Sequence, residues 1–230
     1  MVAALLGVLI GAATVAVATE PACSTDEHPQ VKFCRSDFVL KLTVRNQTGR
    51  SDANGWAQYS IRIKSQIKIS DKFMELPDDA LQSLQIETGQ ALRPGEKYLI
   101  SGRVVRKDRR GAPFLLAGTC DWVELWHQLS HRQRSFLRKG RYEQSCPCRI
   151  ELKQGGERGK RGRRDGLVCG LPDVKSTKIS KALANCYRGS AHCRLRSNDK
   201  GQKSCVWSKN AELDHCIQTT GSLSETEAQL

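Results

Sequence analysis

The sequence predicts a mainly β protein in which a small closed barrel of five strands, flanked by two helices, precedes a disulfide-rich C-terminal module. Three observations lead to this prediction. Short runs of alternating apolar residues are separated by turn signals, and none has the spacing of a βαβ unit. The apolar period changes from two to a helical spacing after Cys120. Ten cysteines are available to stabilise a chain with only 6% aromatic residues.

The first 18 residues carry no charge and are typical of a signal peptide, although the usual basic residues before the apolar stretch are missing. The stretch is short for a membrane span of about 20 residues, and a buried apolar strand or helix is the alternative. Cleavage after Ala18 fits the small-x-small rule. Cleavage after Ala22 would make Cys23 the first mature residue but places Glu20 at the minus-three position. We expect a signal peptide over residues 1–22, or 1–18 by the alternative cut.

A secreted chain is expected to use its ten cysteines in disulfides rather than as metal ligands. Its formal net charge of +13 favours acidic partners such as heparan sulfate and anionic matrix, whereas the compartment disfavours nucleic acid. Residues 154–166 form a glycine-rich basic loop, which is either a polyanion-binding site or a plain disordered insertion. Its candidate polyanion-binding residues are Arg158, Lys160, Arg161, Arg163 and Arg164.

The first predicted strand covers residues 38–44, with apolar side chains at every second position. The sequon at Asn46 follows it and predicts N-glycosylation, with an unmodified turn as the alternative. Asn54-Gly55 is a tight-turn signal. Residues 57–69 form a long strand that pairs antiparallel with the first. Its expected buried face consists of Tyr59, Ile61, Ile63, Ile67 and Ile69.

Three further strands are expected after the loop at Pro77-Asp78-Asp79, and they cover residues 84–87, 98–105 and 114–120. Pro94-Gly95 and Arg109-Arg110-Gly111 supply the turns between them. Five short strands with short connections predict a closed barrel of the OB type.

The helical spacing from Asp121 to Leu129 predicts a first helix, and Ser130 with Gln133 forms a capping box that begins a second one. Gly140 ends the second helix. Cys146-Pro147-Cys148 marks a domain boundary. We expect a barrel domain over residues 23–146, a disulfide-rich module over 147–220 and a disordered acidic tail over 221–230.

The sequence argues against an enzyme and against a cofactor of its own. It contains no HExxH, GxSxG or phosphate-loop motif. His127 and His131 have the spacing of a shared metal site on a helix, but no third ligand accompanies them.

Several ordered segments resemble the tissue inhibitors of metalloproteinases. They are Cys23-Ser24, His28-Pro29-Gln30, Phe33-Cys34, Asp37-Phe38-Val39, Lys97 to Gly102, Cys120-Asp121-Trp122, Cys146-Pro147-Cys148-Arg149-Ile150 and Ser204-Cys205-Val206-Trp207. The resemblance implies a netrin-type, OB-like domain followed by a smaller disulfide module. It also implies a secreted inhibitor of zinc metalloendopeptidases, the matrix metalloproteinases.

In that family the amine and carbonyl of the first mature cysteine chelate the catalytic zinc of the protease, and the resemblance assigns this role to Cys23. Ser24 would enter the pocket for the substrate side chain after the scissile bond, and Thr25 would continue along the cleft. The resemblance adds a supporting protease-contact loop, which consists of Pro77, Asp78, Asp79, Ala80 and Leu81.

The chain departs from the family pattern at Thr25, which stands where a second cysteine is usual, and a partner cysteine near Leu81 to Ile86 is also missing. The resemblance therefore implies disulfides Cys23–Cys120 and Cys34–Cys146. It suggests Cys148–Cys205 among six C-terminal cysteines that allow fifteen connectivities. The alternative function is a non-inhibitory netrin-type module that binds matrix or heparin.

Overall fold

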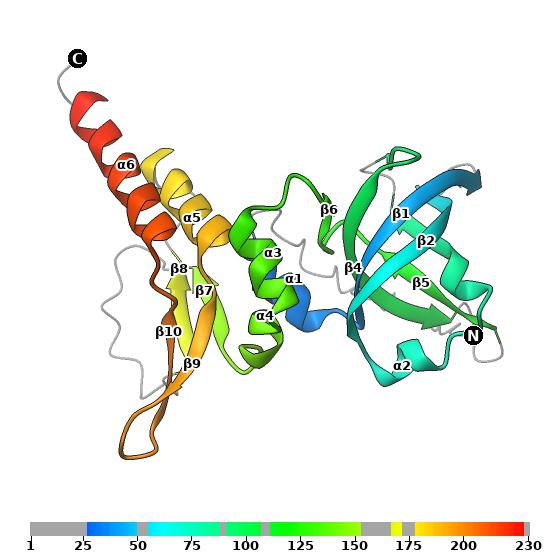
Figure 1. Cartoon of the computed structure of the whole chain (residues 1–230), viewed down its shortest axis with the longest axis horizontal. Helices are drawn as coiled ribbons and strands as arrows, with labels where there is room; N and C mark the ends of the chain where they lie inside the picture. Colours follow the sequence, from blue (N-terminus) through cyan, green and yellow to red (C-terminus); the bar gives the residue numbers. More distant parts are fainter. Residues whose placement is uncertain are drawn as a thin grey trace, which may run out of the picture.

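The computed structural model describes residues 27–49, 55–87, 91–106, 111–152, 167–171 and 178–227 (Figure 1). The predicted signal peptide, Cys23 to Thr25, Asn54 and the basic loop at 158–164 lie outside these residues. A barrel forms one end of the molecule and a smaller α/β module forms the other, with three short helices between them (Figure 1). Within the described residues, no helix has the length and apolar character needed to cross a membrane.

Five strands close the barrel, as the sequence predicts. They are β1 (Phe38–Gly49), β2 (Trp56–Ile69), β3 (Ser83–Glu87), β4 (Lys97–Arg106) and β5 (Pro113–Ala117). The strand order is β1-β2-β3-β5-β4, and β4 pairs back onto β1. The β3–β5 pairing is parallel and the other pairings are antiparallel. β5 ends at Ala117 and not at Cys120, because residues after Ala117 turn away from the sheet.

The barrel interior is filled by the alternating apolar residues of these strands. Phe38, Leu40, Leu42 and Val44 are fully buried there, which agrees with the period-two pattern. At Gly102 the backbone of β4 lies very close to β5, since a Cβ atom at this position would lie 2.2 Å from the carbonyl oxygen of Leu116. Only a residue without a side chain allows the two strands to pass at this distance.

The prediction of a single buried face on β2 is wrong for its second half. Ile67 packs outside the barrel against the helices, and Ile69 is 39% exposed. The register shifts at Val39/Leu40 and at Lys41/Leu42 each add one residue to β2 relative to β1. Each added residue reverses which side chains point inward, so the period-two pattern is interrupted twice between Ile63 and Ile69.

A second apolar cluster lies between the barrel and three helices: α1 (Pro29–Arg35), α3 (His131–Arg138) and α4 (Arg141–Gln144). Its members are Phe33, Val39, Leu99, Trp122, Leu129, Phe136, Leu137 and Tyr142. The capping box at the start of α3 is present, with Gln133 N donating to Ser130 Oγ at 3.0 Å and Ser130 N donating to Gln133 Oε1 at 2.8 Å.

The predicted helix over Asp121 to Leu129 is absent, and β6 (Val123–Leu125) lies there instead. This segment bonds to β4: Trp122 N donates to Ser101 Oγ at 2.7 Å, and Trp126 N donates to the Lys97 carbonyl oxygen at 2.8 Å. The spacing that resembles a helix arises because Trp122 and Leu129 pack into the second cluster from an extended and turned chain.

The C-terminal module contains β7 (Arg149–Leu152), β8 (Val168–Leu171), α5 (Lys178–Ser190), β9 (Cys193–Ser197), β10 (Lys203–Trp207) and α6 (Ala211–Glu227). Its disulfides are Cys148–Cys205, Cys169–Cys193 and Cys186–Cys216. α6 continues to Glu227 and so includes residues 221–227 of the segment expected to be disordered. Asn210 Oδ1 accepts from Leu213 N at 3.0 Å, and a helix started by such a cap can extend through polar residues.

Candidate functional site

His28 is the N-cap of α1 and fixes the chain just before the helix. Its Nδ1 accepts a hydrogen bond from Gln30 N at 3.1 Å, and its Nε2 lies 3.3 Å from the carbonyl oxygen of Tyr187 on α5. Burial lowers the pKa of His28 to about 3, so the ring is neutral at physiological pH. These partners assign the proton to Nε2, which donates to Tyr187, and leave Nδ1 as the acceptor.

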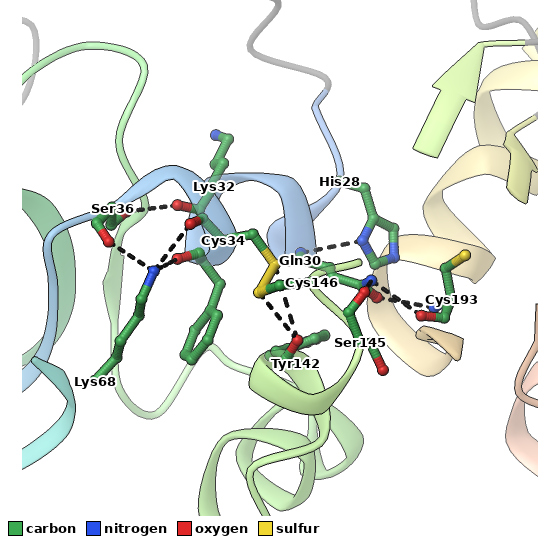
Figure 2. Close-up of a disulfide and its surroundings, with 11 residues drawn as sticks. His28, Gln30, Lys32, Cys34, Ser36, Lys68, Tyr142, Ser145, Cys146 and Cys193 are labelled. Carbon is green, nitrogen blue, oxygen red and sulfur yellow. Dashed lines mark hydrogen bonds between the residues drawn. A yellow bond between two sulfur atoms is a disulfide. The ribbon is translucent and has the colours of Figure 1, made fainter. Parts of the chain in front are cut away.

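Gln30 uses its amide to join α1 to both α4 and β9 (Figure 2). Its Nε2 donates to the carbonyl oxygens of Ser145 and Cys193, each at 3.0 Å. Its Oε1 accepts from Cys193 N at 2.8 Å. Because the side chain is 1% exposed, these three bonds replace water entirely. α1 is therefore held against the C-terminal module by the side chains of two of its first residues.

Lys68, on β2, holds the other end of α1 to the barrel. Its Nζ donates to the carbonyl oxygens of Phe33 and Cys34, both at 2.9 Å, and of Ser36 at 2.6 Å (Figure 2). The last carbonyls of a helix lack intrahelical partners, and a cation there also opposes the helix dipole. Burial lowers the pKa of Lys68, and the nearby charge of Asp37 partly offsets this effect.

A disulfide supplies the third attachment of α1. Cys34 is bonded to Cys146 at the end of α4, with a Cα–Cα distance of 5.4 Å. This pairing and Cys148–Cys205 are two of the three that the resemblance implies. The other two bridges, Cys169–Cys193 and Cys186–Cys216, give the connectivity that the sequence left open.

The turn that carries Cys120 lies beside α1 and is held by three hydrogen bonds. Asp121 N donates to the Gly118 carbonyl oxygen at 3.0 Å, and Gly118 N donates to Asp121 Oδ2 at 2.8 Å. Thr119 N donates to Glu87 Oε2 at 3.0 Å. Cys120 is disulfide-bonded, and its predicted partner, Cys23, lies outside the described residues with Ser24 and Thr25.

A cavity of about 280 Å³ separates the residues around α1 from the Cys120 turn and β6. Glu27 and Lys32 line one side, and Asp121 and Glu124 line the other. Burial raises the pKa of Asp121 and lowers the pKa of Lys32. Glu27 is the first residue that the structure describes, so the cavity lies beside the start of the described chain.

The loop proposed to contact a protease is an exposed ridge on the barrel. Pro77, Asp78 and Asp79 are exposed, whereas Ala80 and Leu81 pack against the barrel core and begin the short 3-10 helix η1 (Ala80–Gln82). Met74 ends the preceding helix α2 (Asp71–Met74) and is 70% exposed. Sequence reasoning did not single out Met74, although it adds an apolar contact surface next to this loop.

The remaining sequence candidates are dispersed. Asn46 is exposed on β1 opposite Ser60, so a glycan attached there would extend into solvent. His127 lies in a turn and His131 begins α3, so the two do not share a helical face. The sulfurs of Cys148, Cys193 and Cys205 lie within 4.8 Å of one another, but all three are in disulfides and offer no thiolate to a metal.

The sequence marks His28 and Gln30 only as matched positions and does not indicate the role of Lys68. His28 followed by Pro29 is a local signal for the start of α1, since proline is favoured at the first position of a helix. No local signal marks Lys68, because its role depends on the pairing of β2 with β1.

Comparison with known proteins agrees with this architecture. Residues 20–156 match the family model described as tissue inhibitor of metalloproteinase. The chain is 30% identical over 130 residues to metalloproteinase inhibitor 3 of Gallus gallus, covering 54% of this chain and 56% of that protein. It is 29% identical over 157 residues to metalloproteinase inhibitor 2 of Canis lupus familiaris, covering 63% and 66% respectively.

The match to metalloproteinase inhibitor 4 of Mus musculus is 25% identical over 142 residues and covers 56% of this chain and 59% of that protein. The chain thus spans little more than half the length of the relatives it matches, and the sequence identity is low. The family model nevertheless covers more than half of the chain, and the protein belongs to the tissue inhibitor of metalloproteinase family.

Proposed function

We propose that this protein is a secreted inhibitor of zinc metalloendopeptidases that chelates the catalytic zinc of the protease through the amine and carbonyl of Cys23. The observation that carries the proposal is the threefold attachment of α1, through Gln30, Lys68 and the Cys34–Cys146 disulfide. This helix begins six residues after Cys23 in a chain that belongs to an inhibitor family.

The chemistry requires only backbone atoms at the terminus. A catalytic zinc ion keeps one coordination position open for water. A free α-amine has a pKa of about 7.7–8.0, and a neighbouring dication favours its deprotonated, ligating form. When the amine and carbonyl occupy the metal, the nucleophilic water is displaced and hydrolysis stops. The zinc belongs to the protease, and the inhibitor supplies no metal or cofactor.

Rigid attachment of α1 increases the affinity that such a short segment can reach. Binding a mobile terminus would lose conformational freedom, and a segment held before binding loses less. His28 is 1% exposed, so the chain is fixed as close as five residues from Cys23. Ser24 and Thr25 would then extend along the cleft of the protease, with the exposed Pro77 to Asp79 ridge and Met74 as a second contact.

The proposal is tested by N-terminal sequencing of the secreted protein together with inhibition of a matrix metalloproteinase catalytic domain. A chain that begins at Cys23 should inhibit, and the same chain with one alanine added before Cys23 should not. A secreted chain that begins at Thr19 would contradict the mechanism, because four extra residues would block the amine.

The second candidate is a non-inhibitory module that binds heparan sulfate or other anionic matrix. The net charge of +13 and the basic loop that contains Arg158 to Arg164 favour it. Replacing Arg158, Lys160, Arg161, Arg163 and Arg164 with alanine should lower the salt concentration at which the protein elutes from heparin. Elution at an unchanged concentration would exclude a role for this loop.

A further inference from the structure

Arg35 links two parts of the chain that are far apart in the sequence, Glu27 and Cys120. It stands in the last turn of α1, and its Nη1 lies 2.5 Å from Glu27 Oε2 in the residues that precede the helix. Its Nη2 donates to the carbonyl oxygen of Cys120. The side chains of Arg35 and Glu27 are 35% and 24% exposed, so both charges are partly removed from water.

Both ends of this link are held by other contacts, and the geometry suits a guanidinium group. α1 is fixed by Lys68 and by the Cys34–Cys146 disulfide, and the Cys120 turn is fixed by Asp121. A guanidinium is planar and can donate to two acceptors at once, which a lysine ammonium cannot do in a fixed fork. Arg35 also faces Asp121, whose carboxyl pKa its charge lowers against the effect of burial.

The covalent support of the segment is limited. Cys23 is the only cysteine in the sequence before α1. One disulfide is therefore the most that can tie this segment to the rest of the chain, and a single bond of this kind leaves rotations about its side-chain torsions. A second constraint at Glu27 would restrict those rotations.

We propose that Arg35 is a positioning residue that holds Glu27, just before α1, against the Cys120 turn, as a non-covalent second bridge beside the disulfide predicted between Cys23 and Cys120. Its effect on inhibition rests on the function proposed above. Its effect on the disulfide does not, because the same link keeps the two sides of that bridge close when it is reduced.

The experiment compares full-length Arg35→Met and Arg35→Lys with the parent protein. Arg132→Met is the matched control, since Arg132 pairs with Glu212 at 3.0 Å and is 33% exposed, but it lies on α3. Each protein is equilibrated in glutathione buffers, and the oxidation state of Cys120 is followed by mass spectrometry with Cys186–Cys216 as internal reference. The inhibition constant against a metalloproteinase catalytic domain is measured in parallel.

We expect Arg35→Met to favour reduction at Cys120 by about tenfold and to weaken inhibition by a similar factor, as for the loss of a charge-assisted hydrogen bond. Arg35→Lys should recover only part of both effects, because it retains the charge without the fork. Arg132→Met should change neither, and Cys186–Cys216 should not respond.

The outcomes separate this inference from the proposed function. If the parent protein does not inhibit, the proposed function fails, and the oxidation equilibrium alone decides the role of Arg35. If the parent inhibits but Arg35→Met matches it in both measurements, the role of Arg35 is refuted while the function stands. Full recovery by Arg35→Lys would also refute the requirement for a guanidinium that donates to two acceptors, since charge alone would then suffice.

Discussion

The imidazole Nε2 of His28 lies 3.3 Å from the carbonyl oxygen of Tyr187, so the residue that begins α1 is hydrogen-bonded to a helix of the C-terminal module. A second buried histidine lies at the same junction, where the ring of His192 packs on Phe136 with their centroids 4.5 Å apart. The junction between barrel and module therefore contains two buried imidazole groups. Their ionisation determines how the contact responds to acid.

Acidification should destabilise the protein between pH 6.5 and about 4. Burial lowers the pKa of His28 to about 3 and that of His192 to about 4, from an ordinary value of 6.5. In this range the unfolded chain binds protons that the folded chain does not, so the free energy of unfolding falls as the pH decreases. Arg188 beside His28, and Arg141 and Arg194 beside His192, act in the same direction.

Urea unfolding at pH 7.5, 6.5 and 5.5 measures this dependence. Replacing His28 with asparagine keeps a helix-capping acceptor but removes one titrating group, and should reduce the pH slope. An exposed histidine, His127, provides the matched control through His127→Asn, which should leave the slope unchanged. A parent protein equally stable at pH 7.5 and 5.5 would contradict the prediction.

Lys68→Met should destabilise the protein by about 1–3 kcal/mol, because three carbonyl oxygens at the end of α1 lose a charged donor. The measurement is the denaturant midpoint and slope. Lys64 lies on the same strand and is exposed, so Lys64→Met is the control and should have little effect. Equal stability of the two variants would show that Lys68 does not secure α1.

Gly102→Ala should destabilise the barrel by at least about 3 kcal/mol or prevent its folding, since strand backbones cannot accommodate the added methyl group. Its Cβ would lie 2.2 Å from the Leu116 carbonyl oxygen and 2.6 Å from the Phe38 ring. At Gly189 on α5 an added Cβ meets nothing within 4 Å, so Gly189→Ala should fold with unchanged or slightly higher stability. Thermal unfolding monitored by circular dichroism compares them.

Tyr142→Phe should leave stability unchanged or raise it by up to about 1 kcal/mol. The Tyr142 hydroxyl is buried and has no hydrogen-bond partner among the described residues, and burial raises its pKa. In contrast, Tyr59→Phe should destabilise, because the Tyr59 hydroxyl accepts from Leu92 N at 3.2 Å. Urea midpoints of the two variants test the difference, and a clear loss in Tyr142→Phe would reveal a partner for its hydroxyl.

The barrel could be predicted because each of its strands is amphipathic over a short span, as β1 shows with Phe38, Leu40, Leu42 and Val44. The buried face of the second half of β2 could not be predicted, because a bulge depends on how two strands pair and leaves no pattern in the sequence of either strand alone. The segment around Trp122 has a helical spacing by coincidence, and its hydrogen bonds to β4 outweigh that pattern.

The candidate site could be predicted only in part. The capping box at Ser130 is a local signal and was found. The contacts of Gln30 with Cys193 and of Lys68 with Ser36 join residues far apart in the sequence. Such contacts follow from the fold and not from any short motif, and the same is true of Cys169–Cys193, one of the pairings that the sequence left open.

Cys146 and Cys148 stand on either side of Pro147, and one is bonded to α1 through Cys34 while the other is bonded to β10 through Cys205. Mechanical load applied to the C-terminal module would therefore travel through sulfur bonds and three residues of chain into α1. A partner that binds the module and pulls on it would therefore apply force directly to α1, which Gln30 and Lys68 also hold in place.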